Sequence, residues 1–257
     1  MIHFDRVTRT FGRKVAVAEL SLSIPAGELF AFLGPNGAGK TTAIRMLVGL
    51  LRPTAGTVSV CGCDSIARSR EAARFLGYVP DQPFLYDKLS GREFLEFVAR
   101  MRGYDPAETA SRIARQSEVF ELKEYLDDLT ETYSHGMRQR VVFAAALLHD
   151  PPVLVLDEPM VGLDPKSGRL VKDLLRARAS AGTTVFMSTH TLSVAEEIAD
   201  RIGIIDRGRL DFLGTLEELR GTMSRDHSSL EQLFLELTNP PSSAGVETGS
   251  PLPEPMP

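Results

Sequence analysis

Hydrophobic residues along the chain gather in short compact runs that alternate with longer segments of helical character. The compact runs predict buried strands, and they cover residues 29–33, 153–156 and 183–188. The longer segments, at 40–50 and 166–181, predict helices. A chain that alternates strands with helices in this way is typical of an α/β fold, in which helices cover a mostly parallel sheet.

The two ends of the chain differ from this core. Residues 2–24 predict short strands with a turn at Phe11-Gly12, and we expect them to form an antiparallel β subdomain. Residues 202–205 predict a strand that enters a hairpin at Asp206-Arg207-Gly208. After Asn239 the chain is rich in Pro, Ser and Gly, which predicts a disordered tail at 239–257. A last amphipathic helix before that tail is indicated by Leu230, Leu233, Phe234 and Leu237.

The middle of the chain, about residues 70–150, has a helical pattern. Residues 141–148 are apolar nearly all round, which predicts a buried helix. We therefore expect one cassette at 1–238, with a helical subdomain inserted at about 82–150. Another helical face in this region is indicated by Phe94, Phe97, Val98 and Met101.

Composition limits the classes of partner. The 257 residues carry a formal net charge of −5, so no overall positive field favours nucleic acid, and we expect no nucleic-acid partner. No window approaches the roughly 18 apolar residues of a spanning helix. We therefore expect any contact with a membrane to pass through a protein partner. Cys61 and Cys63 are too few ligands for a structural zinc site.

A glycine-rich segment between the first compact run and the following helix carries the chemistry. It fits the pattern G-x-x-x-x-G-K-[ST] completely. The glycines let successive backbone N–H groups face inward toward phosphate oxygens, and the next helix adds the positive end of its dipole. Lys40 is expected at the β- and γ-phosphates, and the Thr41 hydroxyl at Mg²⁺. The predicted nucleotide-binding residues here are Gly34, Pro35, Asn36, Gly37, Ala38, Gly39, Lys40, Thr41 and Thr42.

A second strand ends in two acids, Asp157 and Glu158. Mg²⁺ prefers oxygen ligands and keeps several waters, so one carboxylate commonly suffices. Asp157 is the predicted carboxylate at the metal. Glu158 would then lie beside the γ-phosphate and polarise the attacking water as general base.

Four further segments resemble those of the ATP-binding subunits of ABC transporters. The segment Tyr133-Ser134-His135-Gly136-Met137-Arg138-Gln139-Arg140 is similar to the signature of that family, and Val161-Gly162-Leu163-Asp164 to its D-loop. His190 follows a strand, as the switch histidine of the family does, and Phe11 matches the aromatic residue that stacks on adenine. All stand in family order across residues 2–238. The resemblance implies that Ser134, Gly136 and Asp164 bind nucleotide and that His190 joins Lys40 and Glu158 in catalysis.

The resemblance also implies a fold and a mechanism. The fold would be a P-loop NTPase core with an N-terminal antiparallel β subdomain and an inserted helical subdomain. Two cassettes would face each other head to tail around MgATP and drive a separate transmembrane permease subunit. The chain would then lie at the cytoplasmic face of the cell membrane. Within the family it is similar to exporters of the daunorubicin-resistance type, through the signature, Gly214-Thr215-Leu216-Glu217-Glu218-Leu219 and residues 229–238.

Two positions depart from the family pattern. His135 stands where the signature commonly has its first glycine, and Asp81 stands where the Q-loop glutamine aligns. Gln82 comes one residue later, and we expect it at the metal through a shift of the loop.

Three alternatives remain open from the sequence. A soluble ABC ATPase that acts on ribosomes or DNA usually carries two cassettes or basic extensions, and none is visible. A P-loop kinase for a small metabolite would yield a phosphorylated acceptor instead of free phosphate. A regulatory ABC ATPase without transport would lack a multi-span partner.

Overall fold

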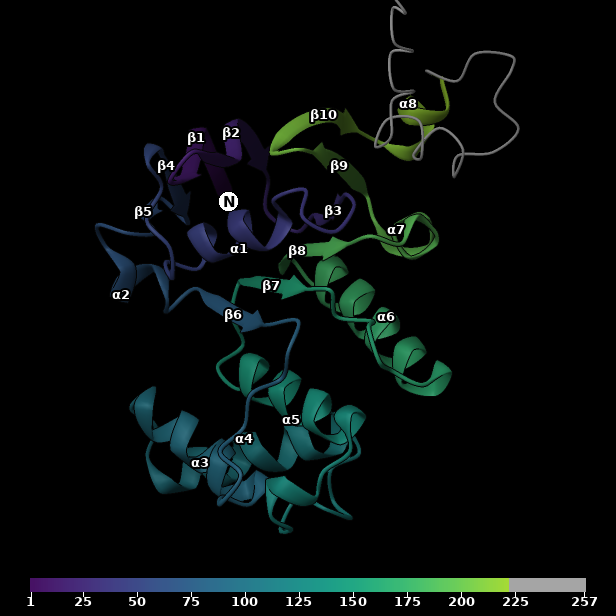
Figure 1. Ribbon diagram of the computed structural model, residues 1–257. Helices are drawn as coiled ribbons and strands as arrows, with labels where there is room; N and C mark the ends of the chain where they lie inside the picture. The colour runs from purple at the N-terminus through teal and green to yellow at the C-terminus, as the bar shows by residue number, and fades with distance from the viewer. Residues whose placement is uncertain (222–257) are drawn as a thin grey trace, which may run out of the picture.

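The computed structural model describes residues 1–221 (Figure 1). The helix predicted around Leu230, the boundary at residue 238 and the tail at 239–257 lie outside the described residues. Within residues 1–221, no helix has the length and apolar character needed to cross a membrane.

A four-stranded antiparallel sheet forms the N-terminal layer. Its strands are β1 (Ile2–Phe11), β2 (Lys14–Ile24), β4 (Ala55–Val60) and β5 (Cys63–Asp64), in the order β2-β1-β4-β5. Inward side chains alternate with exposed ones along β1 and β2, as in a sheet with one face on a core. The expected antiparallel subdomain is therefore confirmed, with two long strands where short ones were predicted.

A six-stranded sheet forms the second layer, in the order β10-β9-β3-β8-β7-β6. Every pairing is parallel except that of β9 with β10, which form the predicted hairpin. All residues of β3, β7 and β8 are buried, as expected for strands covered on both faces. The strands are β3 (Leu29–Leu33), β6 (Leu76–Val79), β7 (Val153–Asp157), β8 (Thr184–Thr189), β9 (Arg201–Asp206) and β10 (Arg209–Gly214).

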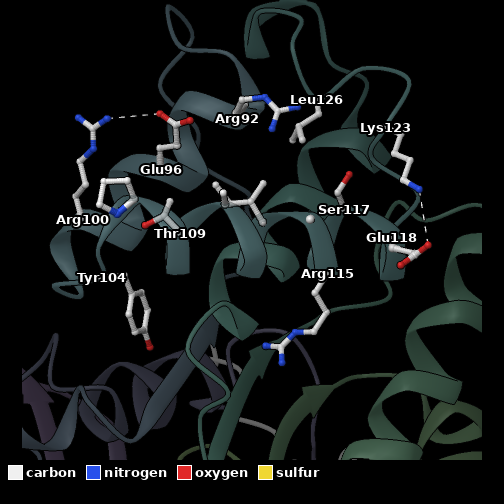
Figure 2. A pocket seen from close by; sticks show the side chains of 14 residues that line it. Arg92, Glu96, Arg100, Tyr104, Thr109, Arg115, Ser117, Glu118, Lys123 and Leu126 are labelled. Carbon is white, nitrogen blue, oxygen red and sulfur yellow. Dashed lines mark ion pairs between the residues drawn. The ribbon is translucent and has the colours of Figure 1, made fainter.

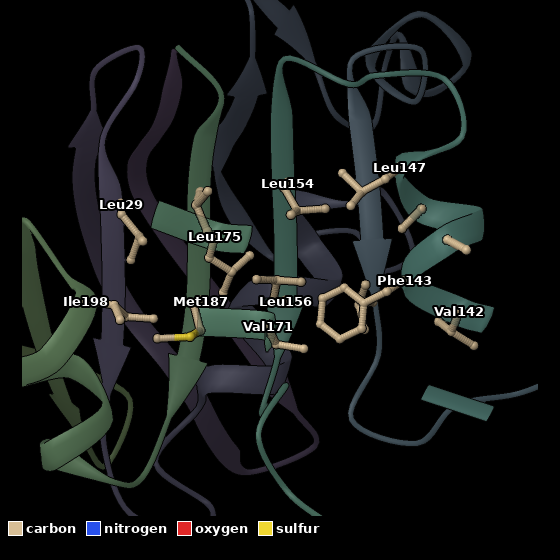
Figure 3. Close-up of a cluster of buried hydrophobic side chains, with 14 of the residues drawn as sticks. Leu29, Val142, Phe143, Leu147, Leu154, Leu156, Val171, Leu175, Met187 and Ile198 are labelled. Carbon is tan, nitrogen blue, oxygen red and sulfur yellow. The ribbon is translucent and has the colours of Figure 1, made fainter. Parts of the chain in front are cut away.

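Two apolar layers flank this second sheet. Between the two sheets, Phe30, Phe32 and Phe186 pack with ring centroids 5.5 to 6.4 Å apart, and α1 (Lys40–Leu47) contributes to the same cluster. On the opposite face, Leu154 and Leu156 pack with α5 (His135–Leu147), α6 (Pro165–Ser180) and α7 (Leu192–Ile198) (Figure 3). Short helices α2 (Ser69–Ala72) and α8 (Leu216–Gly221) complete the described core.

The helical subdomain projects from one end of the six-stranded sheet (Figure 1). It contains α3 (Gly91–Met101), α4 (Pro106–Val119), the 3-10 turn at Thr130–Thr132 and α5. Ser90 and Glu93 form a reciprocal capping box that begins α3, and Asp105 caps α4. The mostly parallel sheet, the antiparallel layer and this insertion confirm the predicted α/β fold class.

The prediction of a helical pattern throughout 70–150 was wrong at Leu76–Val79. These residues form β6, which pairs in parallel with β7. A Cβ atom on Gly77 would lie only 2.5 Å from the backbone oxygen of Ala146, so this strand approaches α5 closely. Four apolar residues carry too little periodicity to separate a strand from a helical turn.

Candidate functional site

The glycine-rich loop joins β3 to α1 at the carboxyl edge of the parallel sheet. Gly37 and Gly39 have φ values of 84° and 117°, a left-handed region that favours glycine. A Cβ atom on Gly34 would lie 2.3 Å from the backbone oxygen of Ile205. The chain can therefore take this path only with glycine at these positions. The resulting concave row of N–H groups at the start of α1 suits phosphate oxygens.

Lys40 is the first residue of α1, and its side chain folds back over the loop. Its Nζ donates hydrogen bonds to the backbone oxygens of Gly34, at 2.6 Å, and Pro35, at 3.2 Å. It also lies 3.2 Å from Oε1 of Glu158. Only 6 % of the lysine side chain is exposed, so this cation is held at the loop and not in bulk solvent.

Asp157 ends β7 and is fully buried. Its Oδ1 accepts a hydrogen bond from the Ser188 hydroxyl at 2.6 Å, while Oδ2 has no hydrogen-bond partner. Burial raises the pKa of Asp157, and the hydrogen bond from Ser188 and the nearby hydroxyl of Thr41 act in the opposite direction. A buried carboxylate oxygen without a partner, next to a threonine hydroxyl, fits a hard divalent cation such as Mg²⁺.

Glu158 follows at a φ of 48°, which turns its side chain away from the strand direction. Its Oε2 lies 3.0 Å from Nδ1 of His190, and its Oε1 faces Lys40. The backbone N–H of Glu158 donates to the Ser188 hydroxyl at 3.0 Å. The carboxylate is thus fixed on both sides, and the structure brings together Lys40, Glu158 and His190, the three residues predicted to be catalytic.

A cleft of about 310 Å³ lies over the loop. Phe11 stands in its wall with 47 % of the residue exposed. Asp81 also lines the cleft, whereas Gln82 does not, and the Asp81 carboxylate accepts a hydrogen bond from the Gln82 backbone N–H. The Q-loop residue placed at the cleft is therefore Asp81. The wall further includes Lys14, Ala16, Pro35, Asn36, Gly37, Gly39, Lys40, Thr41, Thr42 and Glu158.

The signature residues lie outside this cleft, at the start of α5. Ser134 caps the helix by accepting from the backbone N–H of Met137, and Gly136 follows in the first turn. A Cβ atom on Gly162 would lie 2.8 Å from the His135 ring, so this histidine packs against the D-loop. Within residues 1–221, the cleft over the phosphate loop and the signature surface are therefore separate.

Asp164 begins α6, also outside the cleft. Its carboxylate caps the backbone N–H groups of Lys166 and Ser167 and accepts from the Ser167 hydroxyl at 2.6 Å. Arg140 of α5 donates to that hydroxyl at 2.7 Å. The signature helix and the D-loop are thereby joined through three polar side chains.

Sequence reasoning missed Ser188, which binds both Asp157 and the Glu158 backbone. The β7–β8 pairing places Asp157 directly beside Ser188. The signal was present, because both residues close adjacent parallel strands, whose carboxyl ends meet at one edge.

A larger cavity of about 890 Å³ lies in the helical subdomain (Figure 2). Its charged groups are largely neutralised locally, since Arg100 pairs with Glu96 and Lys123 with Glu118. None of the residues predicted for the site lines it. The chemistry therefore belongs to the smaller cleft at the sheet edge.

A phosphate loop with an adjacent pair of acids at the end of a parallel strand defines a P-loop nucleotide hydrolase. The ABC transporter family model matches residues 17–161, and this chain belongs to that family. It is an ATP-binding and ATP-hydrolysing cassette of an ABC transporter.

The chain is 42 % identical to the daunorubicin/doxorubicin resistance ATP-binding protein DrrA of Streptomyces peucetius, over 86 % of this chain and 67 % of that protein. It is 36 % identical to the linearmycin resistance ATP-binding protein LnrL of Bacillus subtilis (strain 168), over 88 % of this chain and 73 % of that protein. A solved ATP-binding subunit of an ABC transporter superposes with a TM-score of 0.85 at 30 % identity, over 92 % and 99 %. A solved dimeric cassette in a post-hydrolysis state, bound to ADP and Pi, superposes with a TM-score of 0.77 at 27 % identity. The match covers 84 % of this chain and 99 % of that chain.

Proposed function

We propose that this chain powers an exporter by binding and hydrolysing MgATP in the cleft over the phosphate loop. The observation that carries the proposal is the placement of Glu158 between Lys40 and His190 at that loop. A carboxylate held in this way is suited to act as a base.

Each part of the cleft has a role in holding the substrate. The loop N–H groups and the ammonium of Lys40 bind the phosphates. Thr41 and Asp157 would hold Mg²⁺, which neutralises charge on the phosphate oxygens when bound. Asp81 also lines the cleft, and its negative charge acts on Asp157. Phe11, at the wall of the cleft, takes the adenine ring.

Glu158 orients the attacking water and withdraws its proton. His190 donates or shares a hydrogen through Nδ1 at 3.0 Å and thus keeps the carboxylate aimed at the cleft. The left-handed backbone at Glu158 contributes to the same orientation.

We propose a head-to-tail dimer, because Ser134, which is exposed, and Gly136, which is half-buried, stand at a helix start but do not line this chain's own cleft. In a second copy they would close over the nucleotide. Asp164, at the end of the D-loop, would lie between the two sites. The two dimeric cassette structures similar to this chain support such an assembly.

We further propose a separate membrane-spanning subunit and a location at the cytoplasmic face of the membrane. Its docking site would be an apolar groove of about 350 Å³ where α3 and α5 approach β6. Phe94 and Val98, predicted to share a helical face, line it. Phe97 and Met101 of the same face are exposed. Relatives named for drug resistance and Nod factor export favour an exporter over an ABC ATPase without transport.

The test is ATP hydrolysis by the purified chain with Mg²⁺, followed as free phosphate. Lys40→Ala should abolish most of the rate and weaken ATP binding, because it removes the buried cation from the phosphates. Arg6→Gln, an exposed cation on β1, is the matched control and should hydrolyse ATP like the wild type. Unchanged ATP affinity in Lys40→Ala would place the nucleotide elsewhere.

A further inference from the structure

Arg9 of β1 packs against the aromatic ring of Phe11. Its guanidinium carbon lies 4.5 Å from the ring centroid, well within the range of a cation–π contact. One guanidinium N–H also donates to the backbone oxygen of Arg52 at 2.9 Å, and Nε is buried without a hydrogen-bond partner. The charged group is therefore held at the ring instead of extending into solvent.

The charge of Arg9 has no acidic partner in the part of the chain that the structure describes. The ion pairs of residues 1–221 do not include Arg9, although Arg6 on the same strand pairs with Asp5. Removing a cation from water costs free energy when no carboxylate pairs with it, unless another contact offsets that cost. The face of the Phe11 ring is the contact that the structure provides.

The ring has two faces, and the guanidinium of Arg9 covers one of them. Phe11 lines the cleft over the phosphate loop, whereas Arg9 does not. A ligand in the cleft can therefore stack only on the face of the ring that Arg9 leaves uncovered. The opposite face stays open, since Phe11 is 47 % exposed.

We propose that Arg9 is a positioning residue for the nucleotide base, which backs the Phe11 ring while adenine stacks on its open face. This inference rests on the proposed binding of ATP in the cleft. It assigns to Arg9 a part of the affinity for the base and none of the affinity for the phosphates.

Two physical effects support this role. A cation on one face of an arene draws π-electron density toward itself, which makes the other face a better surface for an electron-rich purine. An exposed phenylalanine that is held in place also loses less rotamer freedom when a ligand stacks on it.

The neighbouring segment braces the same platform. Thr54 donates its backbone N–H to the oxygen of Thr8 at 2.7 Å, and its hydroxyl accepts from the backbone N–H of Thr10 at 3.1 Å. Together with the bond from Arg9 to Arg52, these contacts fix β1 on both sides of Arg9. These contacts hold the strand segment that carries Phe11.

The experiment compares two probes in titration calorimetry, ATP and inorganic tripolyphosphate, each with Mg²⁺. Arg9→Gln should weaken ATP binding about twofold to fivefold and leave tripolyphosphate binding unchanged. Arg9→Lys retains the charge without the planar group and should lie between Arg9→Gln and the wild type. Arg6→Gln removes a cation from the same strand and should change neither affinity.

A second arm uses Phe11→Ala. In that background Arg9→Gln should have no further effect on ATP, because the ring through which it acts is gone. The role of Arg9 would be overturned if Arg9→Gln weakened the binding of ATP and tripolyphosphate equally, or if it bound ATP with wild-type affinity. It would also be overturned if the losses of ATP affinity from Arg9→Gln and Phe11→Ala were additive in the double variant. Absence of ATP binding in the wild type would instead overturn the proposed function. Thermal midpoints check that each variant is folded.

Discussion

At the scale of single residues, the two carboxylate oxygens of Glu158 contact two different side chains. Lys40 lies at one oxygen and His190 at the other. Glu158→Gln should keep the shape of this side chain but remove its ability to accept a proton. We expect ATP binding to persist, the turnover rate to fall by about 10²- to 10⁴-fold, and an ATP-bound dimer to accumulate. Phosphate release and size-exclusion chromatography with ATP measure both effects. A monomeric, fully active variant would exclude Glu158 as the base.

Asp81 is the residue for which the sequence and the family pattern disagree most. It lines the cleft, and its negative charge contributes to raising the pKa of Asp157, after the larger effect of burial. We expect Asp81→Asn and Gln82→Ala to keep basal ATPase within about tenfold of the wild type, since neither residue is the base. Both should reduce the extra activity seen with the membrane partner. The rate with and without that partner is the measurement. If Asp81→Asn were as inactive as Glu158→Gln, the base would belong to this loop.

The individual residues show what a sequence can and cannot predict. Lys40 and Asp157 were predicted because local motifs fix both the residue type and its place after a strand. Asp81 in place of Gln82 depended on a one-residue register in a loop without periodicity. Ser188 acts on Asp157 of the neighbouring strand, and such contacts depend on strand order, which no single motif specifies.

At the scale of elements, the end of α5 is attached to β6 through His149. Its Nε2 lies 3.1 Å from the backbone oxygen of Leu76, while Nδ1 is buried without a partner. Burial lowers the pKa of His149 to about 4, with the charge of Arg102 acting in the same direction. The folded protein therefore holds this imidazole neutral.

This shift predicts a pH dependence of stability. Between the ordinary pKa of 6.5 and about 4, the unfolded chain binds a proton at His149 that the folded chain does not. The free energy of unfolding should thus fall with falling pH, by at most about 1.4 kcal/mol per pH unit from this group. His149→Gln should remove that part of the slope. Urea unfolding of the wild type and of His149→Gln at pH 7 and pH 5 measures this slope. The contribution of the carboxylates is the same in both proteins and cancels when their slopes are subtracted. Parallel slopes would contradict the assignment.

The elements also explain why β6 was predicted to be helical. Strands β3, β7 and β8 are buried along their whole length, because the antiparallel sheet and α1 cover one face of the six-stranded sheet and helices α5, α6 and α7 cover the other. Strand β6 is an edge strand of four residues, and the elements before and after it in the chain are the helices α2 and α3. Its identity is set by pairing with β7, a tertiary effect that periodicity does not detect.

At the scale of the whole molecule, the loop after β6 connects two surfaces. Asp81 lies at the cleft, and Phe84, three residues on, lies in the apolar groove between the sheet and the helical subdomain. A shift of the loop in response to nucleotide would therefore alter the groove. This arrangement would give a physical route from ATP hydrolysis to the proposed membrane subunit.

The groove can be tested apart from catalysis. Phe84 and Leu50 line it and are 71 % and 68 % exposed, so a charge at either position should not unfold the chain. We expect Phe84→Glu and Leu50→Glu to keep basal ATPase and the thermal midpoint. Both should lose the membrane-spanning protein that co-purifies with the wild type from detergent-solubilised membranes, because a carboxylate would be buried unpaired in the interface.

Leu213→Glu, on the exposed side of β10, is the matched control and should retain the partner. Retention of the partner by both groove variants would place docking on another surface, whereas loss of basal ATPase alone would show that the groove belongs to the catalytic unit.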